Sequence, residues 1–215
     1  MRYYESFDNY KIDPSLIGEE VYAFNKYDGQ NFVAKLNIRK KTFDLFGTRK
    51  RLVDETDENY KKAIELFKKE ESELLKIVKE NPKIFSEKEA EFYFEFVGEN
   101  SFCGMHKEGD KMHLILIDIW IHKKGYIEPK EFCKVTEGKN IEVAEVVYKG
   151  KLTKDFIKEI ETNIETNKYP IVKEGVVCKK TTKLKGQRLP KCKVKTLWWL
   201  EKVKEKYPDD WEERI

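Results

Sequence analysis

A lysine beside a tight turn is the first feature of this 215-residue chain that could do chemistry. Lys26 stands in Lys26-Tyr27-Asp28-Gly29, directly after an apolar segment, and Gly29 supplies the turn. A lysine amine in a cleft becomes a nucleophile when burial or a nearby cation lowers its pKa. K-x-D-G alone is a weak signal, because a solvated lysine in a surface turn has the same sequence.

Carboxylates and further lysines follow this turn in a defined order. Glu95 lies in an aromatic run, and Glu174 directly precedes a short apolar segment, where a metal ligand would be held rigidly. Lys193 and Lys195 are two residues apart, so on a strand their side chains share one face. Two cations on one face suit the binding of a phosphate.

The elements that must position these residues follow from the hydrophobic pattern. Apolar runs and alternation predict strands over 20–25, 31–37, 42–46, 91–97, 113–121, 175–179 and 191–195. Helical spacing of apolar residues predicts helices over 57–80, 153–162 and 197–207, with Trp198 and Trp199 turned inward in the last. The first three strands suggest an antiparallel meander around the Lys26 turn.

The mixture of strands and helices indicates the fold class. They do not alternate regularly, and no linker, repeat or low-complexity tract interrupts them. We therefore predict one α+β domain over residues 1–215, with antiparallel sheets flanked by helices.

Composition limits the class of partner. Charged residues make up 39% and hydrophobic residues 40%, which indicates a folded core under a charged surface rather than disorder. The net charge of +3 excludes a bulk polycation, so a nucleic acid would need a local basic patch. Residues 179–195 contain eight Lys and Arg, which either follow a phosphate backbone or form a solvated loop.

Cysteine usage and apolar runs argue against other classes. The four cysteines form no C-x-x-C pair, and no Cys/His cluster has the spacing of a zinc site. The N-terminus has no apolar signal core, and no run reaches membrane-spanning length. We therefore expect a cytoplasmic protein without a membrane partner.

Taken in order, these motifs resemble a known superfamily. K-x-D-G, the aromatic-flanked Glu95, E-G-V-V-x-K from Glu174 and the K-x-K that ends at Lys195 are similar to the motifs of covalent nucleotidyltransferases. This superfamily contains polynucleotide ligases and mRNA capping enzymes. The resemblance covers nearly the whole chain and implies the ligase/capping nucleotidyltransferase fold.

Within the superfamily, the chain resembles RNA ligases of the phage and kinetoplastid-editing type, similar to RNA ligase 2. Residues 26–32 match K-x-x-G-x-N-F, with Asn31 where DNA ligases usually carry Arg, and the opening segment 4–10 resembles that family's N-terminus. Only 20 residues follow Lys195, so no OB-fold domain is expected. The resemblance implies RNA rather than DNA as substrate. Whether a protein partner stands in place of a C-terminal domain is left open by the sequence.

The resemblance also implies an AMP carrier. Lys26 corresponds to the lysine that attacks the α-phosphate of ATP and forms a lysyl-AMP bond. Lys193 and Lys195 correspond to lysines on the α-phosphate and the leaving group, and Glu174 to the metal-associated carboxylate. The implied cofactors are ATP, with AMP as the covalent adduct, and Mg²⁺, with Mn²⁺ as an alternative.

The remaining motif positions are implied to hold the nucleotide or the nucleic-acid end: Asn25, Asp28, Gly29, Asn31, Arg49 and Glu95. Glu95 corresponds to the residue on the ribose hydroxyl, and Arg49 to one on ribose or the nucleic-acid end. Asn31 is implied to lie near the reacting phosphate. Asn25 stands where relatives often carry an acid that reads the adenine amine, and its amide can accept the same bond.

A second departure, one ambiguity of register and two alternative functions stay open. Leu116 and Ile117 stand where many relatives stack a Phe on adenine, and Lys191 with Lys193 is a second K-x-K. The alternatives to an RNA ligase are a DNA ligase or GTP-using capping core, and a non-catalytic nucleic-acid-binding module with the same fold. Asn31 and the missing OB-fold argue against the first, and the complete motif set argues against the second.

Overall fold

The computed structural model describes residues 4, 8–11, 13–99, 107–184 and 188–214. Its strands are β1 (Glu20–Lys26), β2 (Gln30–Asn37), β3 (Thr42–Gly47), β4 (Leu52–Val53), β5 (Glu89–Val97), β6 (His113–Ile121), β7 (Gly125–Tyr126), β8 (Val146–Lys151), β9 (Gly175–Lys180) and β10 (Lys191–Lys195). Its helices are α1 (Lys61–Glu80), α2 (Pro129–Thr136), α3 (Lys154–Glu161), α4 (Asn163–Thr166) and α5 (Leu197–Lys206), with 3₁₀ turns η1 (Pro14–Leu16) and η2 (Trp211–Arg214). Part of the opening segment, residues 5–7, lies outside the described residues.

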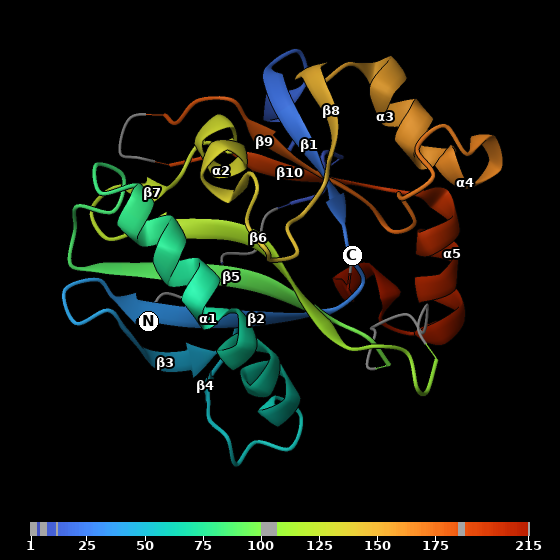
Figure 1. Cartoon of the computed structure of the whole chain (residues 1–215). Coiled ribbons are helices and arrows are strands. Elements are labelled where there is room, and N and C mark those ends of the chain that lie inside the picture. Colours follow the sequence, from blue (N-terminus) through green and yellow to red (C-terminus); the bar gives the residue numbers. More distant parts are fainter. Residues whose placement is uncertain (1–3, 5–7, 12, 100–106, 185–187, 215) are drawn as a thin grey trace.

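The strands form two antiparallel sheets (Figure 1). One has four strands in the order β10-β9-β1-β8, and the other has six in the order β4-β3-β2-β5-β6-β7. Helix α1 lies over the six-stranded sheet, α3 and α4 lie beside the four-stranded one, and α5 follows the end of β10. The predicted α+β class with antiparallel sheets and flanking helices is confirmed.

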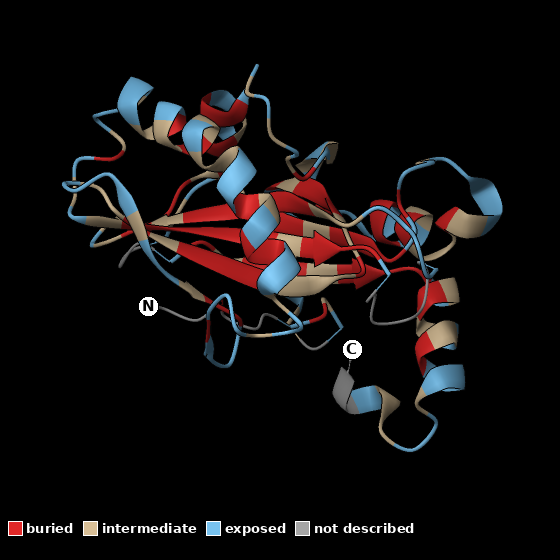
Figure 2. Cartoon of the chain, turned by 60° about the horizontal axis from the view of Figure 1, so that its bottom comes forward, coloured by how far each residue is buried: buried red, intermediate tan, exposed pale blue. Residues whose placement is uncertain are grey.

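Each sheet has its own hydrophobic core. Ile64, Phe67, Leu74 and Ile77 of α1 pack against the six-stranded sheet, and residues of α3 pack against the four-stranded sheet. Figure 2 shows buried residues concentrated in the strands, with the outer faces of the helices exposed. The apolar stripe of α1 therefore follows the helical spacing read from the sequence.

The predicted meander around Lys26 is wrong. Strand β1 pairs with β8 and β9, whereas β2 pairs with β3 and β5 in the other sheet. The reason is that β1 is buried on both faces: Val21 and Ala23 lie in one core, and Phe24 lies in the other. The turn 27–29 is thus a crossing between sheets rather than a hairpin.

Other elements differ from the prediction in detail. The first helix begins at Lys61 instead of 57, because Asp57 accepts a hydrogen bond from the Asn59 N–H (3.1 Å) and closes a turn there. Helix α2 and strand β8 were not predicted, since α2 is one short amphipathic segment and β8 is a half-exposed edge strand without alternation. None of the helices in the described ranges is both long and apolar enough to cross a membrane.

Candidate active site

A cavity of about 670 Å³ receives side chains from both sheets. The four-stranded sheet contributes Lys26 at the end of β1 and Lys193 and Lys195 on β10. The six-stranded sheet contributes Asn31 from β2 and Glu95 from β5. Residues far apart in the sequence therefore meet in one space, and all ten predicted site residues line it: Asn25, Lys26, Asp28, Gly29, Asn31, Arg49, Glu95, Glu174, Lys193 and Lys195.

Glu174 is the centre of the inner end of this cavity. Its Oε1 lies 2.8 Å from Lys26 Nζ and 3.3 Å from Lys195 Nζ, and the side chain is only 2% exposed. Its other oxygen, Oε2, is buried without a hydrogen-bond partner among the described residues. One carboxylate thus holds two lysines and keeps one oxygen for a further cation.

Local packing fixes where Glu174 sits. Gly175 has φ +152°, and a Cβ there would lie 2.2 Å from the Val194 carbonyl oxygen, so β9 and β10 approach as only glycine allows. The Thr196 N–H donates to the Glu174 carbonyl (2.9 Å), and the Thr196 hydroxyl donates to the Lys173 carbonyl (2.7 Å). The strand start that carries Glu174 is therefore tied to the segment that follows Lys195.

The protein groups alone keep Lys26 protonated. Burial by itself would lower its pKa, but the negative charges of Glu174 and Glu95 outweigh this effect and raise the pKa above the ordinary lysine value. A nucleophilic amine needs the opposite shift. Additional positive charge beside Glu174 would weaken this ion pair and favour the neutral amine.

The two lysines of β10 are shifted in the other direction. Burial and the positive charge of Lys26 lower the pKa of Lys193 to about 8. Burial, only partly offset by Glu174, lowers the pKa of Lys195 to about 7. Both ammonium groups would gain from an anion placed between them, because phosphate charge stabilises the protonated form.

Trp199 of α5 supports Lys195. The Lys195 Nζ lies 3.4 Å from the centroid of the Trp199 ring, whose side chain is buried. A cation over an indole face is stabilised most when both are removed from water. The prediction that Trp199 turns inward is confirmed, whereas Trp198 is only half-buried.

Glu95 links the lysine turn to the six-stranded sheet. The Gly29 N–H donates to Glu95 Oε1 (3.2 Å), and a Cβ on Gly29 would lie 2.5 Å from the Phe96 carbonyl oxygen. Burial raises the pKa of Glu95 to about 7, although Lys26 partly offsets this. The glycine of K-x-D-G is thus required by close contact with β5 rather than by a hairpin.

Several predicted polar residues are buried at the cavity wall. The Asn25 N–H donates to the Glu145 carbonyl (2.8 Å), while its Oδ1 has no partner within the described ranges. The Oδ1 and Nδ2 atoms of the Asn31 side chain also have no hydrogen-bond partner among the described residues. Asp28 is 3% exposed, and Arg49 is exposed at the mouth. Unpartnered buried amides are costly, and a polar ligand would satisfy them.

The positions of the three β10 lysines distinguish the two possible K-x-K motifs. Lys193 and Lys195 line it, whereas Lys191 lies further along β10 and pairs with Asp118 (2.8 Å). Lys179 pairs with the same carboxylate (2.9 Å), and all three groups are buried. The basic strip 179–195 is therefore not a continuous outward surface, since these two lysines point into the protein.

An apolar region adjoins the polar end. Phe24, Ile117, Ala144 and Val177 line the cavity there, while Leu116 is fully buried in the core. Ile117 and not Leu116 is therefore the aliphatic residue available to a ring at the position of the missing Phe.

Sequence reasoning missed other residues that line the cavity: Tyr4, Tyr27, Gln30, Thr48, Lys50, Arg51, Tyr60, Lys179 and Trp199. Six of them lie inside or next to motifs quoted from the sequence: Tyr4, Tyr27, Gln30, Thr48, Lys50 and Lys179. The run Arg49-Lys50-Arg51 is a basic signal that is visible in the sequence, although the family resemblance identifies only Arg49 in it.

The residues present fit a divalent cation that keeps most of its waters. No group of three or more His, Cys, Asp or Glu side chains in the described ranges could enclose a metal ion. Mg²⁺ does not need such a cage, because it commonly binds through one or two carboxylates and substrate phosphates. The free Oε2 of Glu174 is a suitable ligand.

The sequence is also similar to known proteins. The family model described as RNA ligase matches residues 19–195. No curated protein matches the sequence.

Similar solved structures share the fold. A Naegleria gruberi RNA ligase with PPi has a TM-score of 0.66 at 17% identity, with 95% of this chain and 58% of that chain covered. A putative ATP-dependent DNA ligase from Aquifex aeolicus has a TM-score of 0.65 at 17% identity, with 100% and 57% covered. A mutant of the Naegleria ligase with ATP and Mn has a TM-score of 0.64 at 16% identity, with 94% and 58% covered. The chain thus spans less than two thirds of the length of these proteins.

Proposed function

The chain belongs to the RNA ligase family, and we propose that residues 1–215 are a nucleotidyltransferase domain that carries AMP on Lys26 and joins polynucleotide ends with ATP. The observation that carries this proposal is the meeting of Lys26, Glu174 and Lys195 in one cavity, with both lysines on one carboxylate oxygen. The K-x-x-G-x-N-F motif and the family favour RNA over DNA as the polymer.

The first step would transfer AMP from ATP to the protein. Lys26 Nζ loses a proton, for which Glu174 Oε1 at 2.8 Å is the nearest acceptor, and attacks the α-phosphorus. An N–P bond forms, the bond to the bridging oxygen breaks, and pyrophosphate leaves. Such chemistry depends on positioning and on neutralising phosphate charge. Lys193 and Lys195 supply two cations for the α-phosphate and the leaving group.

A divalent cation suits the inner end of the cavity. Mg²⁺, or Mn²⁺ in its place, supplies neutralisation of phosphate charge when bound. Glu174 Oε2 would hold it, and its charge would offset the carboxylates that raise the Lys26 pKa. The protonated resting lysine is therefore an argument for a metal requirement.

The remaining residues would orient the nucleotide. Asn25 Oδ1 is a free acceptor for the adenine amine, and the ring would lie against Ile117. Glu95 would accept from a ribose hydroxyl, and Asn31 would lie near the reacting phosphate. Asp28 and Gly29 hold the lysine turn, and Arg49 at the mouth would meet the ribose or the nucleic-acid end.

The later steps would use the nucleic acid. A 5′-phosphate oxygen attacks the phosphorus of lysyl-AMP, the N–P bond breaks, and the Lys26 amine is regenerated. A neighbouring 3′-hydroxyl then attacks the activated 5′-phosphate, a phosphodiester forms, and AMP leaves. Both steps exchange one phosphate bond for another, so no further co-reactant is needed.

The test is intact mass of the protein after incubation with ATP and Mg²⁺. Wild type should gain the mass of one AMP, and Lys26→Ala should gain none. Lys35→Ala is the matched control, because the Lys35 side chain is 19% exposed and ion-paired, while that of Lys26 is 21% exposed and ion-paired. An adduct that persists in Lys26→Ala would contradict the proposal.

Two further measurements separate the alternatives. A GTP adduct without an ATP adduct would indicate a capping-type core, and sealing of pre-adenylylated DNA but not RNA would indicate a DNA ligase. A protein that binds RNA equally well with and without Lys26, and forms no adduct, would be a non-catalytic binding module.

A further inference from the structure

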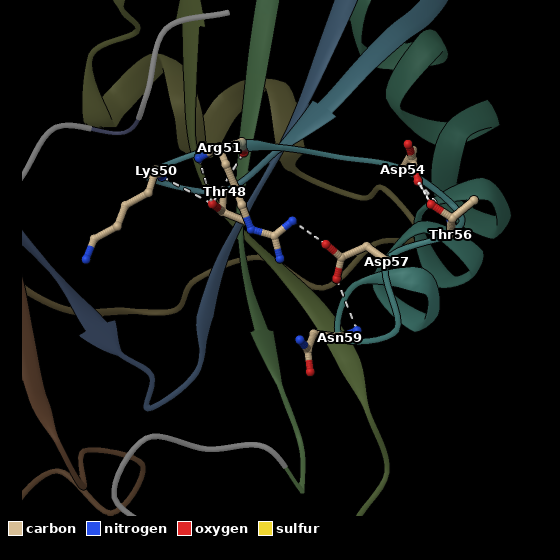
Figure 3. Close-up of polar contacts among 7 residues, drawn as sticks. All are labelled: Thr48, Lys50, Arg51, Asp54, Thr56, Asp57 and Asn59. Atoms are coloured by element: carbon tan, nitrogen blue, oxygen red, sulfur yellow. Dashed lines mark hydrogen bonds and ion pairs between the residues drawn. The ribbon is translucent and has the colours of Figure 1, made fainter.

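The segment between β3 and β4 holds three consecutive cations on a rigid turn. The Thr48 hydroxyl accepts hydrogen bonds from the N–H groups of Lys50 (3.1 Å) and Arg51 (3.2 Å), and Thr48 N–H donates to the Arg51 carbonyl (2.8 Å). Thr48 is itself buried, so this turn is anchored to the protein (Figure 3). Arg49, Lys50 and Arg51 thereby present exposed side chains from one fixed piece of backbone.

Charge is segregated along this segment. Arg49, Lys50 and Arg51 line the cavity, whereas the acidic residues that follow them, 54, 55, 57 and 58, do not. The whole lining contains seven basic side chains and three carboxylates. The carboxylates are those of the inner residues Asp28, Glu95 and Glu174. The mouth of the cavity is therefore positive, which favours a polyanion.

One acidic residue nevertheless reaches the basic side. Asp57 forms an ion pair with Arg51, whose guanidinium also lies 6.0 Å from the centroid of the Tyr60 ring. Figure 3 shows the Arg51 guanidinium turned toward Asp57 while the Lys50 side chain extends the other way. Arg51 is 54% exposed, so its pair with Asp57 is a contact that solvent and a phosphate can reach.

We propose that Lys50 and Arg51 bind the sugar–phosphate backbone of the polynucleotide that is adenylylated, and that Asp57 competes with this phosphate for Arg51. This rests on the proposed ligase function and adds the surface that guides the strand to Lys26. Arg49, Lys50 and the Tyr60 ring border the same opening, so a strand passing over the turn enters the cavity beside the AMP-carrying lysine.

The pyrophosphate leaving group is the other phosphate-containing ligand that Lys50 and Arg51 could bind at this cavity. Lys193 and Lys195 serve it better, because they are withdrawn from solvent beside Lys26 and Glu174, while Lys50 and Arg51 are exposed. A chain of phosphates that extends beyond the cavity matches exposed cations, each of which adds salt dependence to binding. The experiment distinguishes the two sources.

The test is fluorescence anisotropy of a 5′-phosphorylated, single-stranded 20-nucleotide RNA, titrated with the full chain at several salt concentrations. Lys50→Ala and Arg51→Ala should each weaken binding roughly five-fold near 0.1 M salt and reduce the slope of log K against log salt by about 0.7. Lys62→Ala is the matched control, since Lys62 is 52% exposed and ion-paired but lies on α1 outside the cavity lining. It should leave both quantities unchanged.

Asp57→Asn tests the competition. It should tighten RNA binding by roughly two- to five-fold, because Arg51 loses its internal anion. Asp54→Asn removes the same charge from the same segment, where Asp54 accepts from the Thr56 N–H (2.9 Å) instead of pairing with Arg51. Equal tightening by both variants would overturn the competition and leave only a general charge effect.

Formation of the AMP adduct separates this proposal from the proposed function. In the Lys50 and Arg51 variants, RNA binding should weaken by a larger factor than the inhibition of adduct formation by pyrophosphate. Weaker inhibition by pyrophosphate with unchanged RNA binding would assign the turn to the leaving group and overturn the proposal. If wild type forms no adduct, the function fails, yet the RNA titrations still decide whether this turn binds the backbone.

Discussion

At the scale of single residues, the ring beneath Lys195 should control the charge of that lysine. The Trp199 ring lies 3.4 Å from Lys195 Nζ, and a desolvated cation–π contact contributes about 2 kcal/mol to the charged form. Burial already lowers the Lys195 pKa to about 7. We expect Trp199→Leu to lower this pKa by about one further unit. Adduct formation should then slow more at pH 8 than at pH 6.5.

The control for this prediction is Trp199→Phe. It keeps an aromatic face and should restore most of the wild-type pH profile of adduct formation. A packing defect alone would slow the reaction by the same factor at both pH values. That result in Trp199→Leu would assign Trp199 to the core and not to the support of Lys195.

Residue chemistry was predictable where a motif is local and not where residues meet by folding. Lys26, Glu95, Glu174, Lys193 and Lys195 each stand in a short pattern whose residue types suit phosphate chemistry, and all line the cavity. Trp199 and Tyr60 also line it, but neither has a local pattern that differs from a core aromatic. The raised pKa of Lys26 was not predicted, since it depends on two carboxylates from distant segments.

At the scale of elements, Asp118 joins the two sheets. It lies on β6, and its carboxylate binds Lys179 of β9 and Lys191 of β10, at 2.9 and 2.8 Å. The Tyr4 hydroxyl also donates to it (2.7 Å). Asp118→Asn leaves two buried ammonium groups without a counter-charge and should cost about 3–5 kcal/mol in unfolding free energy. Urea denaturation at pH 7 measures this loss.

The pH dependence of this contact has a defined sign. Burial alone would raise the pKa of Asp118, but Lys179 and Lys191 outweigh it and lower the pKa below its ordinary value. The stabilisation is therefore complete above the unfolded pKa of about 4 and is lost as pH falls through the folded pKa. The gap between wild type and Asp118→Asn should close below about pH 4. A gap that is constant down to pH 2 would contradict the ion-pair interpretation.

Glu70 on helix α1 has a pKa shift in the opposite direction to that of Asp118. Burial, with the charge of Glu142 as a smaller effect, raises the pKa of Glu70 to about 7, and its Oε2 has no partner among the described residues. Ionised Glu70 therefore opposes folding increasingly as pH rises from the unfolded value to about 7. Glu70→Gln should add about 1 kcal/mol at pH 8 and almost nothing at pH 4.5. Equal stabilisation at both pH values would assign the gain to other causes.

Elements were predictable where periodicity is strong, and their partners were not. Strands β6 and β10 have the predicted bounds, His113–Ile121 and Lys191–Lys195, because β6 is a nearly continuous apolar run and β10 alternates lysine with Cys192 and Val194. The sheet assignment of β1 failed, since its alternation is the same whether it pairs with β2 or with β9. The pairing of β1 depends on the two hydrophobic cores that form on its two faces. Neither core is specified by any single segment of the sequence.

At the scale of the whole molecule, the cavity is where the two sheets depend on each other. Each sheet packs on its own hydrophobic cluster, and the cavity lining is shared between them. The motifs on both sides of this space are visible in the sequence. The space itself could not be predicted, because its lining comes from both sheets, which the crossing at residues 27–29 and the contacts of Asp118 connect.

A nucleotide that contacts both sheets should therefore stabilise the whole chain against unfolding. ATP with Mg²⁺ at one hundred times its Kd adds about 2.7 kcal/mol, which for a chain of this size raises Tm by roughly 5–10 °C. Differential scanning fluorimetry measures the shift, and one transition is expected because the ligand couples the two cores. Lys26→Ala should retain most of the shift without the adduct, since it keeps Glu174, Lys193 and Lys195. If instead two transitions appear and only one moves with ATP, the nucleotide is bound by one sheet alone, and the shared cavity is not its site.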